Sequence, residues 1–150
     1  MATYRHILVP TDGSRLSAKA AQTAARLARM LGARITAIYA VPEGVPTLFS
    51  GDKLYGSGIL GREYRALARR EAKRALAVVE IEAELAGVAY SGVHALSRHP
   101  WRAIIRAARS RRCDLIVMAS HGRSGLTALA LGSETAKVLA HSRIPVLVCR

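Results

Sequence analysis

Acidic residues are scarce in this chain, and their scarcity sets its electrostatic character. The 150 residues include 10 Asp and Glu against 23 Lys and Arg, so the formal net charge is +13 at pH 7. A field of this sign attracts anions in general, and nucleic acid, acidic lipid and nucleotide phosphates all qualify. The arginines recur mostly on the polar faces of expected helices and form no single block. This pattern is typical of solvated helix surfaces, and the charge alone selects no partner.

Aromatic residues, cysteines and long apolar runs are also few. With 1 Phe, 1 Trp and 5 Tyr in a chain that is 51% hydrophobic, the core must consist mainly of Ala, Val, Leu and Ile. Cys113 and Cys149 lie beside or within expected strands, without the spacing of a disulfide framework or a metal site. We therefore expect buried free thiols and a cytoplasmic protein. No apolar run approaches the ~20 residues of a membrane span, and no signal-peptide pattern opens the chain.

Short apolar runs and helical periodicities alternate along the chain, which favours one α/β domain over residues 1–150. Strands are expected at about 5–10, 34–41, 88–96, 115–119 and 145–149, and helices at about 16–31, 62–86, 100–108 and 133–140. Ser14 and Gly32 are residue types that cap the two ends of a helix. The alternation predicts a parallel sheet with helices on both faces. The stretch from Pro42 to Gly61, with 5 glycines and 2 prolines, is expected to be a functional or mobile loop.

The topology suggests where a ligand would bind. Open α/β sheets bind ligands outside the carboxyl ends of their strands, at the point where the strand order reverses. In a five-stranded sheet of order 3-2-1-4-5, this point lies between the first and fourth strands. The loops that follow these strands are Thr11–Ser14 and Ser120–Gly132. Given that strand order, the two loops face each other across one crevice, and we expect the site there.

The second of these loops has the composition of a phosphate-binding loop. Glycine lets the backbone approach a ligand closely, and the start of the following helix offers unpaired N–H groups. The candidate donors are Gly122, Gly125, Gly132 and Ser133. A flexible loop followed by a helix cap has the same composition, and Arg123 either clamps a phosphate or points into water. Asp12, on the opposite lip, either accepts hydrogen bonds from a ribose or a base edge, or caps its own turn.

Motifs of common nucleotide-dependent and hydrolytic enzymes are missing. The sequence contains no G-x-x-x-x-G-K-[ST] and no G-x-S-x-G, so a P-loop and an α/β-hydrolase are unsupported. None of the 5 histidines has the spacing of metal ligands. His121 is the only one in the expected site, and we interpret it as a loop hydrogen-bonding residue rather than a catalytic base. The sequence thus predicts no catalytic residue and no metal site.

Four sequence blocks carry a family resemblance. They are Ile7–Ser14, Val117–Leu126, Leu131–Ser133 and Ile144–Val148. In this order they resemble the universal stress protein family across essentially the whole chain. The resemblance implies a doubly wound sheet of order 3-2-1-4-5, of the adenine nucleotide alpha hydrolase-like type, in a protein that is usually dimeric. One branch of this family binds ATP.

The ATP-binding branch carries Gly, two residues, Gly, nine residues and then Gly-Ser or Gly-Thr. Here Gly122, nine residues and Gly132-Ser133 fit, and Ala119 stands where the branch has its first glycine. The resemblance implies an adenosine near Pro10, Thr11, Asp12 and Val41, and a ribose and phosphates near Ala119, Gly122, Gly132, Ser133 and Glu134. The candidate binding residues also include neighbours in the same segments, namely Met118, His121, Arg123, Gly125 and Thr135.

Glu134 departs from what a phosphate site would favour. If Ser133 caps the last helix, Glu134 lies in the first turn, where a carboxylate interacts favourably with the helix dipole. Its carboxylate would then take the electrostatic place of a phosphate or repel one. Alternatively, the side chain points to solvent while its backbone N–H still donates.

These patterns together predict a universal stress protein that binds an adenine nucleotide and acts as a dimeric stress-response regulator. The ligand would be ATP or AMP, with Mg²⁺ in the case of ATP, and hydrolysis should be slow at most because no general base is evident. Val146, Leu147 and Val148 would form an exposed apolar edge strand, and pairing of two such strands predicts a homodimer. The competing interpretation is an interaction module that binds no nucleotide and contacts nucleic acid through surface arginines, although no recognition motif supports it. Neither a membrane partner nor a nucleic-acid partner is expected.

Overall fold

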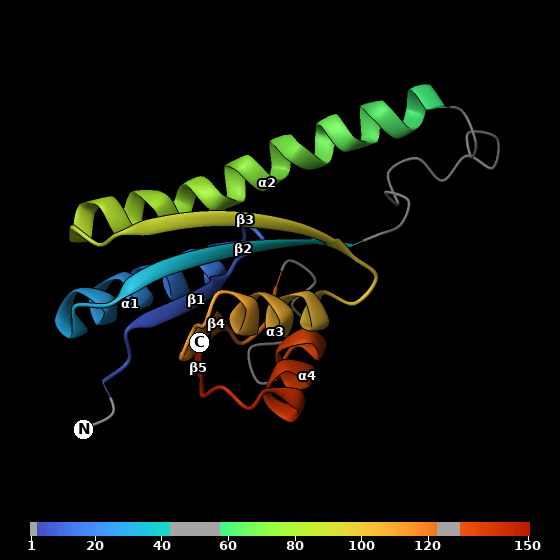
Figure 1. Cartoon of the computed structure of the whole chain (residues 1–150). Coiled ribbons are helices and arrows are strands. Elements are labelled where there is room, and N and C mark those ends of the chain that lie inside the picture. Colours follow the sequence, from blue (N-terminus) through green and yellow to red (C-terminus); the bar gives the residue numbers. More distant parts are fainter. Residues whose placement is uncertain (1–2, 43–57, 123–129) are drawn as a thin grey trace.

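The computed structural model describes residues 3–42, 58–122 and 130–150 (Figure 1). Its elements are, in chain order, β1 (His6–Pro10), α1 (Arg15–Leu31), β2 (Arg34–Pro42), α2 (Gly58–Ala86), β3 (Tyr90–Ser97), α3 (Pro100–Ser110), β4 (Leu115–Ala119), α4 (Ser133–His141) and β5 (Val146–Cys149). The strands form one parallel sheet in the order β3-β2-β1-β4-β5. The predicted fold class is therefore confirmed.

Helices cover both faces of the sheet, with α1 and α2 on one face and α3 and α4 on the other (Figure 1). β1 and β4 lie in the middle, and all of their residues are buried. Because successive strand residues face opposite sides, Ile7 and Val9 belong to the core beneath α1 and α2, whereas Leu8 belongs to the core beneath α3 and α4. Strands buried on both faces typically consist of continuous apolar residues, as β4 does and as β1 does after His6. Among the described residues, no helix combines the length and the apolar character needed to cross a membrane.

Both ends of α1 carry the predicted caps. Ser14 has an extended backbone, and its side-chain oxygen accepts a hydrogen bond from the Ser17 N–H at 3.2 Å. Gly32 follows the helix in the left-handed conformation, with φ of 66°, and so ends it at a residue without a Cβ. The helix faces the sheet with small buried side chains: Ala20, Ala21, Ala24, Ala25 and Ala28. These caps fix where the loop after β1 ends and the helix begins.

α2 begins at Gly58, earlier than the predicted start at Arg62. Gly58 and Gly61 have low helix propensity, which weakens the helical pattern of this first turn. Together with the glycine at 56 they also match G-x-G-x-x-G, which marks a dinucleotide site only when it follows a strand directly. The described strand that precedes this motif, β2, ends at Pro42. The remainder of the expected loop, residues 43–57, lies outside the described residues.

β3 begins at Tyr90 rather than at the predicted Val88. The difference arises because the residues before Tyr90 terminate α2. Gly87 has a φ of 68°, and the Val88 N–H donates to the Ala83 carbonyl at 2.9 Å, a bond that closes the end of the helix. The apolar side chain at 88 therefore belongs to the helix end and not to the strand.

Candidate functional site

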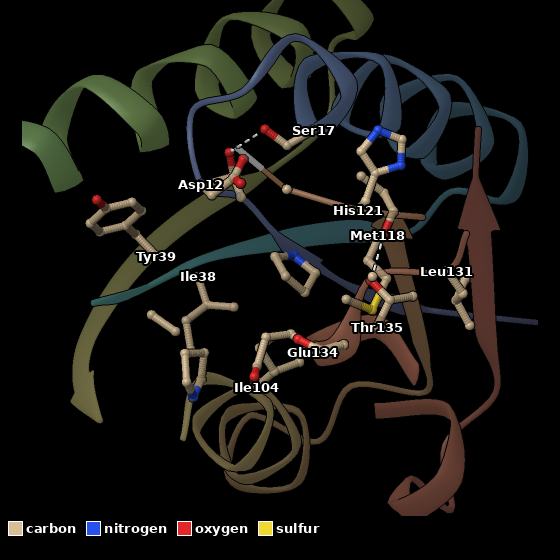
Figure 2. A pocket seen from close by; sticks show the side chains of 18 of the residues that line it. Asp12, Ser17, Ile38, Tyr39, Ile104, Met118, His121, Leu131, Glu134 and Thr135 are labelled. Carbon is tan, nitrogen blue, oxygen red and sulfur yellow. Dashed lines mark hydrogen bonds between the residues drawn. The ribbon is translucent and has the colours of Figure 1, made fainter. Parts of the chain in front are cut away.

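A cavity of about 910 Å³ lies at the carboxyl ends of β1, β2 and β4, beside the first turn of α4. This is the switch point of the sheet, because β1 has β2 on one side and β4 on the other. Figure 2 shows Asp12 and Ser17 on one side of the cavity and Ile104 and Glu134 on the other. The described lining residues are Pro10, Thr11, Asp12, Ser17, Ile38, Tyr39, Ala40, Pro100, Ile104, Met118, Ala119, His121, Gly122, Ala130, Leu131, Gly132, Ser133, Glu134 and Thr135.

Most of the predicted binding residues belong to this lining. Arg123 and Gly125 lie outside the described residues, and Val41 belongs to β2 with a side chain that is likewise outside the description. The prediction missed some of the lining residues: Ser17, Ile38, Tyr39, Ala40, Pro100, Ile104, Ala130 and Leu131. Part of the β2 contribution could have been found, because in a parallel sheet the end of β2 lies beside the end of β1. The observed register pairs Pro10 with Ile38.

Asp12 shapes the loop that follows β1. Its Oδ1 accepts a hydrogen bond from the Ser14 N–H at 2.9 Å, and the Thr11 hydroxyl oxygen accepts one from the Gly13 N–H at 3.2 Å. Gly13 has a φ of 78°, a conformation that favours glycine. The turn-capping role that we predicted as one alternative for Asp12 is therefore present. Its role toward a ligand stays a prediction.

Asp12 and Gly122 are neighbours, although their loops are far apart in the sequence. A Cβ placed on Gly122 would collide with Oδ2 of Asp12. The φ of Gly122 is not positive, so its lack of a side chain matters here for the close approach to the Asp12 carboxylate and not for an unusual backbone conformation. The two loops thus meet across the switch point, as the predicted strand order requires.

The start of α4 is packed tightly against the end of β4. The Gly132 N–H donates to the Ser120 carbonyl at 2.7 Å, and a Cβ on Gly132 would lie 3.0 Å from the Cα of His121. Gly132 is also the N-cap residue of α4, without a side-chain hydrogen bond, so the helix begins at Ser133 as predicted and the cap considered at Ser133 lies one residue earlier. At this position the contact with Ser120 and His121, which follow β4, leaves little room for a side chain. In the first turn of α4, the Thr135 hydroxyl donates to the Ala119 carbonyl at 2.9 Å.

Glu134 connects the first turns of two helices. Its Oε2 accepts a hydrogen bond from the Trp101 N–H at 2.8 Å, at the start of α3, and its Oε1 lies 3.4 Å from Lys137 Nζ. The carboxylate therefore caps α3, which has no side-chain cap of its own at His99. The sequence suggested that the carboxylate either interacts with the dipole of its own helix or points to solvent. It instead caps the neighbouring helix α3 and also lines the cavity.

The cavity differs in charge from the chain as a whole. Among the described lining residues, Asp12 and Glu134 carry carboxylates, and there is no lysine or arginine. The remaining polar groups are hydroxyls, backbone amides and the His121 imidazole, whose Nδ1 lies 3.1 Å from the Ser120 hydroxyl oxygen. No group of three or more metal-ligating side chains occurs in the part of the chain that the structure describes. The lining suits hydrogen bonding more than the binding of a densely charged anion.

The two cysteines do not belong to the described lining of the cavity. Cys113 is free and buried, and Cys149 is free and half-buried. Burial raises the pKa of Cys113 to about 11 and also raises the pKa of Cys149. Because the thiolate is the nucleophilic form, neither cysteine is activated near neutral pH. The prediction of free thiols is confirmed, with Cys149 less buried than expected.

The fold and the cavity define an open, doubly wound α/β protein with a cavity at its switch point. A family model described as the universal stress protein family matches residues 3–150. The chain therefore belongs to the universal stress protein family, as the resemblance indicated.

The relatives are similar over nearly their whole length. Universal stress protein MJ0531 of Methanocaldococcus jannaschii is 35% identical over 147 residues, which cover 98% of this chain and 82% of that protein. Universal stress protein YxiE of Bacillus subtilis is 33% identical over 151 residues, which cover 98% of this chain and 99% of YxiE. Among solved structures, protein MJ0577 has a TM-score of 0.82 at 24% identity, with 99% of this chain and 96% of that chain covered. UspA of Lactobacillus plantarum has a TM-score of 0.79 at 26% identity, with both chains covered completely.

Three more distant structures were solved with ligands. A universal stress protein in complex with cAMP has a TM-score of 0.68 at 22% identity, and the match covers 98% of this chain and 97% of that protein's chain. The Archaeoglobus fulgidus protein in complex with dAMP has a TM-score of 0.66 at 18% identity, with 99% and 100% covered. An Arabidopsis thaliana family member with AMP bound has a TM-score of 0.66 at 15% identity, with 96% and 90% covered. At these identities the likeness shows a shared fold.

Proposed function

We propose that the chain binds an adenine nucleotide in the cavity at the ends of β1 and β4, and acts as a regulator in the stress response. The observation that carries the proposal is the cavity itself. It lies at the switch point and combines an apolar part with a glycine-bounded polar part. AMP and ATP are the candidate ligands, with Mg²⁺ accompanying ATP.

The lining divides into regions that suit the parts of a nucleotide. Ile38, Ile104 and Met118 offer apolar surface for a base (Figure 2). Asp12 offers a carboxylate acceptor for ribose hydroxyls. Gly132 and the first residues of α4 offer backbone amides and a favourable helix dipole for a phosphate. In the proposal, Arg123 and Gly125 contribute from outside the described residues.

The ligand-bound relatives support an adenine compound. The cAMP, dAMP and AMP named in those structures all contain adenine and a single phosphate. A ligand with one phosphate suits this cavity better than one with several, because the charged groups of the described lining are two carboxylates. Any hydrolysis of ATP should be slow, since the described residues bring together no metal-binding cluster.

The edge of the sheet supports a homodimer. β5 is an edge strand, and Leu147 on it is 40% exposed. An exposed apolar edge favours pairing with a second strand, and a two-fold axis would pair β5 with its own copy. We also propose a cytoplasmic location, because two free thiols suit a reducing compartment.

Isothermal titration calorimetry with AMP and ATP tests the nucleotide site. Wild-type protein should release heat in a saturable titration. Asp12→Ala removes the carboxylate and should weaken binding, whereas Asp12→Asn retains an acceptor for the Ser14 N–H and separates the loss of charge from the loss of the turn. Native mass spectrometry of the purified protein would show a co-purified nucleotide and the subunit number together. Absence of heat with every adenine nucleotide at millimolar concentration would rule out the proposal.

A further inference from the structure

A second hollow lies beside α3 and the end of α4. The two helices are neighbours on one face of the sheet (Figure 1). Its volume is about 490 Å³, and its lining includes Trp101, Arg102, Ile105, Arg106, Arg109 and His141. We call it the α3–α4 groove. It shares no described lining residue with the cavity at the ends of the strands.

Three arginines follow one side of the groove. Arg102, Arg106 and Arg109 are spaced by four and three residues, so they lie on one face of α3. The helical rise places the first and the last about 10 Å apart. All three are exposed, and none of them forms an ion pair with a described residue. The described lining also contains no acidic side chain, so a polyanion would relieve the mutual repulsion of these charges.

An aromatic pair lies beside the arginines. The rings of Trp101 and His141 stack with centroids 4.6 Å apart and an interplanar angle of 24°. The Arg102 guanidinium lies 5.1 Å from the centroid of the Trp101 ring. Unpaired bases stack on flat rings of this kind, while neighbouring arginines bind the phosphate backbone of the nucleic acid.

We propose that the α3–α4 groove binds single-stranded nucleic acid, with the arginines along the phosphates and the aromatic pair beside a base. The surface is concave, whereas an element that reads duplex DNA must project into the groove of the duplex. A lipid surface fits less well, because Ile105, the aliphatic residue of the lining, is buried and cannot insert into a bilayer. The site is separate from the proposed nucleotide site and does not depend on it.

The single tryptophan of the chain makes this groove directly observable. A labelled oligothymidylate of about 15 nucleotides is titrated and followed by anisotropy, and the emission of Trp101 is followed with the unlabelled oligomer. We expect saturable binding that changes the Trp101 emission. The double variant Arg106→Gln, Arg109→Gln should bind about tenfold more weakly, and the slope of log K against log salt should fall by about 1.4, as for two lost phosphate contacts.

The matched control removes the same charge elsewhere. Arg69→Gln with Arg70→Gln changes two exposed arginines of α2, and binding should stay within about twofold of wild type at physiological salt. Thermal melts confirm that both double variants fold. Equal losses in the two would mean a general charge effect, and saturable binding without a change in Trp101 emission would place the oligomer elsewhere. Either result overturns the proposal, as would tighter binding to a duplex of the same length or to phosphatidylserine vesicles.

Added AMP separates this proposal from the proposed nucleotide site. Saturating AMP should leave oligomer binding in place, because the two linings are distinct. Displacement by AMP would assign the oligomer to the first cavity and overturn the groove assignment. A failure of AMP to bind at all would count against the nucleotide site alone.

Discussion

Glu134 should determine how many phosphates the cavity accepts. Its carboxylate lines the cavity, accepts a hydrogen bond from the Trp101 N–H and lies near Lys137. Glu134→Gln removes the negative charge while the amide oxygen can still accept from Trp101. The cost to stability should be small, about 0.3–1 kcal/mol for the lost interaction with the dipole of α3.

The effect on binding follows from the size of the cavity. A volume of about 910 Å³ corresponds to a width of about 10 Å, so a bound phosphate lies within roughly that distance of Glu134. Two unit charges about 10 Å apart repel by ~1.7 kcal/mol at an effective dielectric constant of ~20, and salt reduces this to ~0.5 kcal/mol. ATP carries about two more negative charges than AMP, so the carboxylate should disfavour ATP relative to AMP by ~1 kcal/mol, or about fivefold. The side chain is 39% exposed, so the screened value applies rather than the unscreened one.

The assay is calorimetry with AMP and with ATP, in EDTA and again in Mg²⁺. In EDTA, Glu134→Gln should lower the Kd for ATP relative to that for AMP by up to about fivefold. Lys137→Gln removes the cation beside Glu134 and should shift the ratio in the opposite direction. Mg²⁺ should diminish both shifts, because it neutralises part of the ATP charge. An unchanged ATP-to-AMP ratio in both variants would refute the electrostatic reasoning, even if both nucleotides bind.

Three further predictions concern the fold and the assembly. Gly132→Ala would place a Cβ 3.0 Å from the Cα of His121, so urea unfolding should show a loss of about 1–3 kcal/mol. Burial lowers the pKa of His6, so the unfolded chain binds the proton more readily; stability should therefore fall as pH decreases below the ordinary value of 6.5, and His6→Gln should flatten this decrease in urea titrations between about pH 7 and 5. Leu147→Glu should abolish the proposed homodimer by placing like charges on the exposed edge of β5, and light scattering that still reports a dimer would contradict pairing through this edge.

The sheet could be predicted because its two central strands are buried on both faces. β4 and, after His6, β1 consist of continuous apolar residues, and such runs between amphipathic helices have few other interpretations. The caps at Ser14 and Gly32 depend on local chemistry and were also predictable. The start of β3 was misjudged because Val88 is apolar, whereas its backbone completes the helix terminus at Gly87.

The candidate site could be predicted only where the composition of a loop indicates a binding role. The loops containing Asp12 and Gly122 follow central strands, so the topology brings them together. The partner of Glu134 was not predictable, because Trp101 is 33 residues away in the chain and meets it only when α3 and α4 pack side by side. The same holds for Ile104, which reaches the cavity through the packing of α3 on the sheet.

The helix α3 separates two surfaces of opposite electrostatic character. Ile104 faces the cavity, whose described lining contains carboxylates but no lysine or arginine, whereas Arg102, Arg106 and Arg109 line the groove on the outer side. The net charge of +13 therefore describes the exterior of the molecule more than its cavity. A ligand with one phosphate and a long polyanion need not compete for the same cations, since an exposed charge about 10 Å or more away is largely screened at physiological salt. It follows that replacing the groove arginines should alter oligonucleotide affinity much more than AMP affinity, and comparable losses in both would show that the two surfaces are not electrostatically independent.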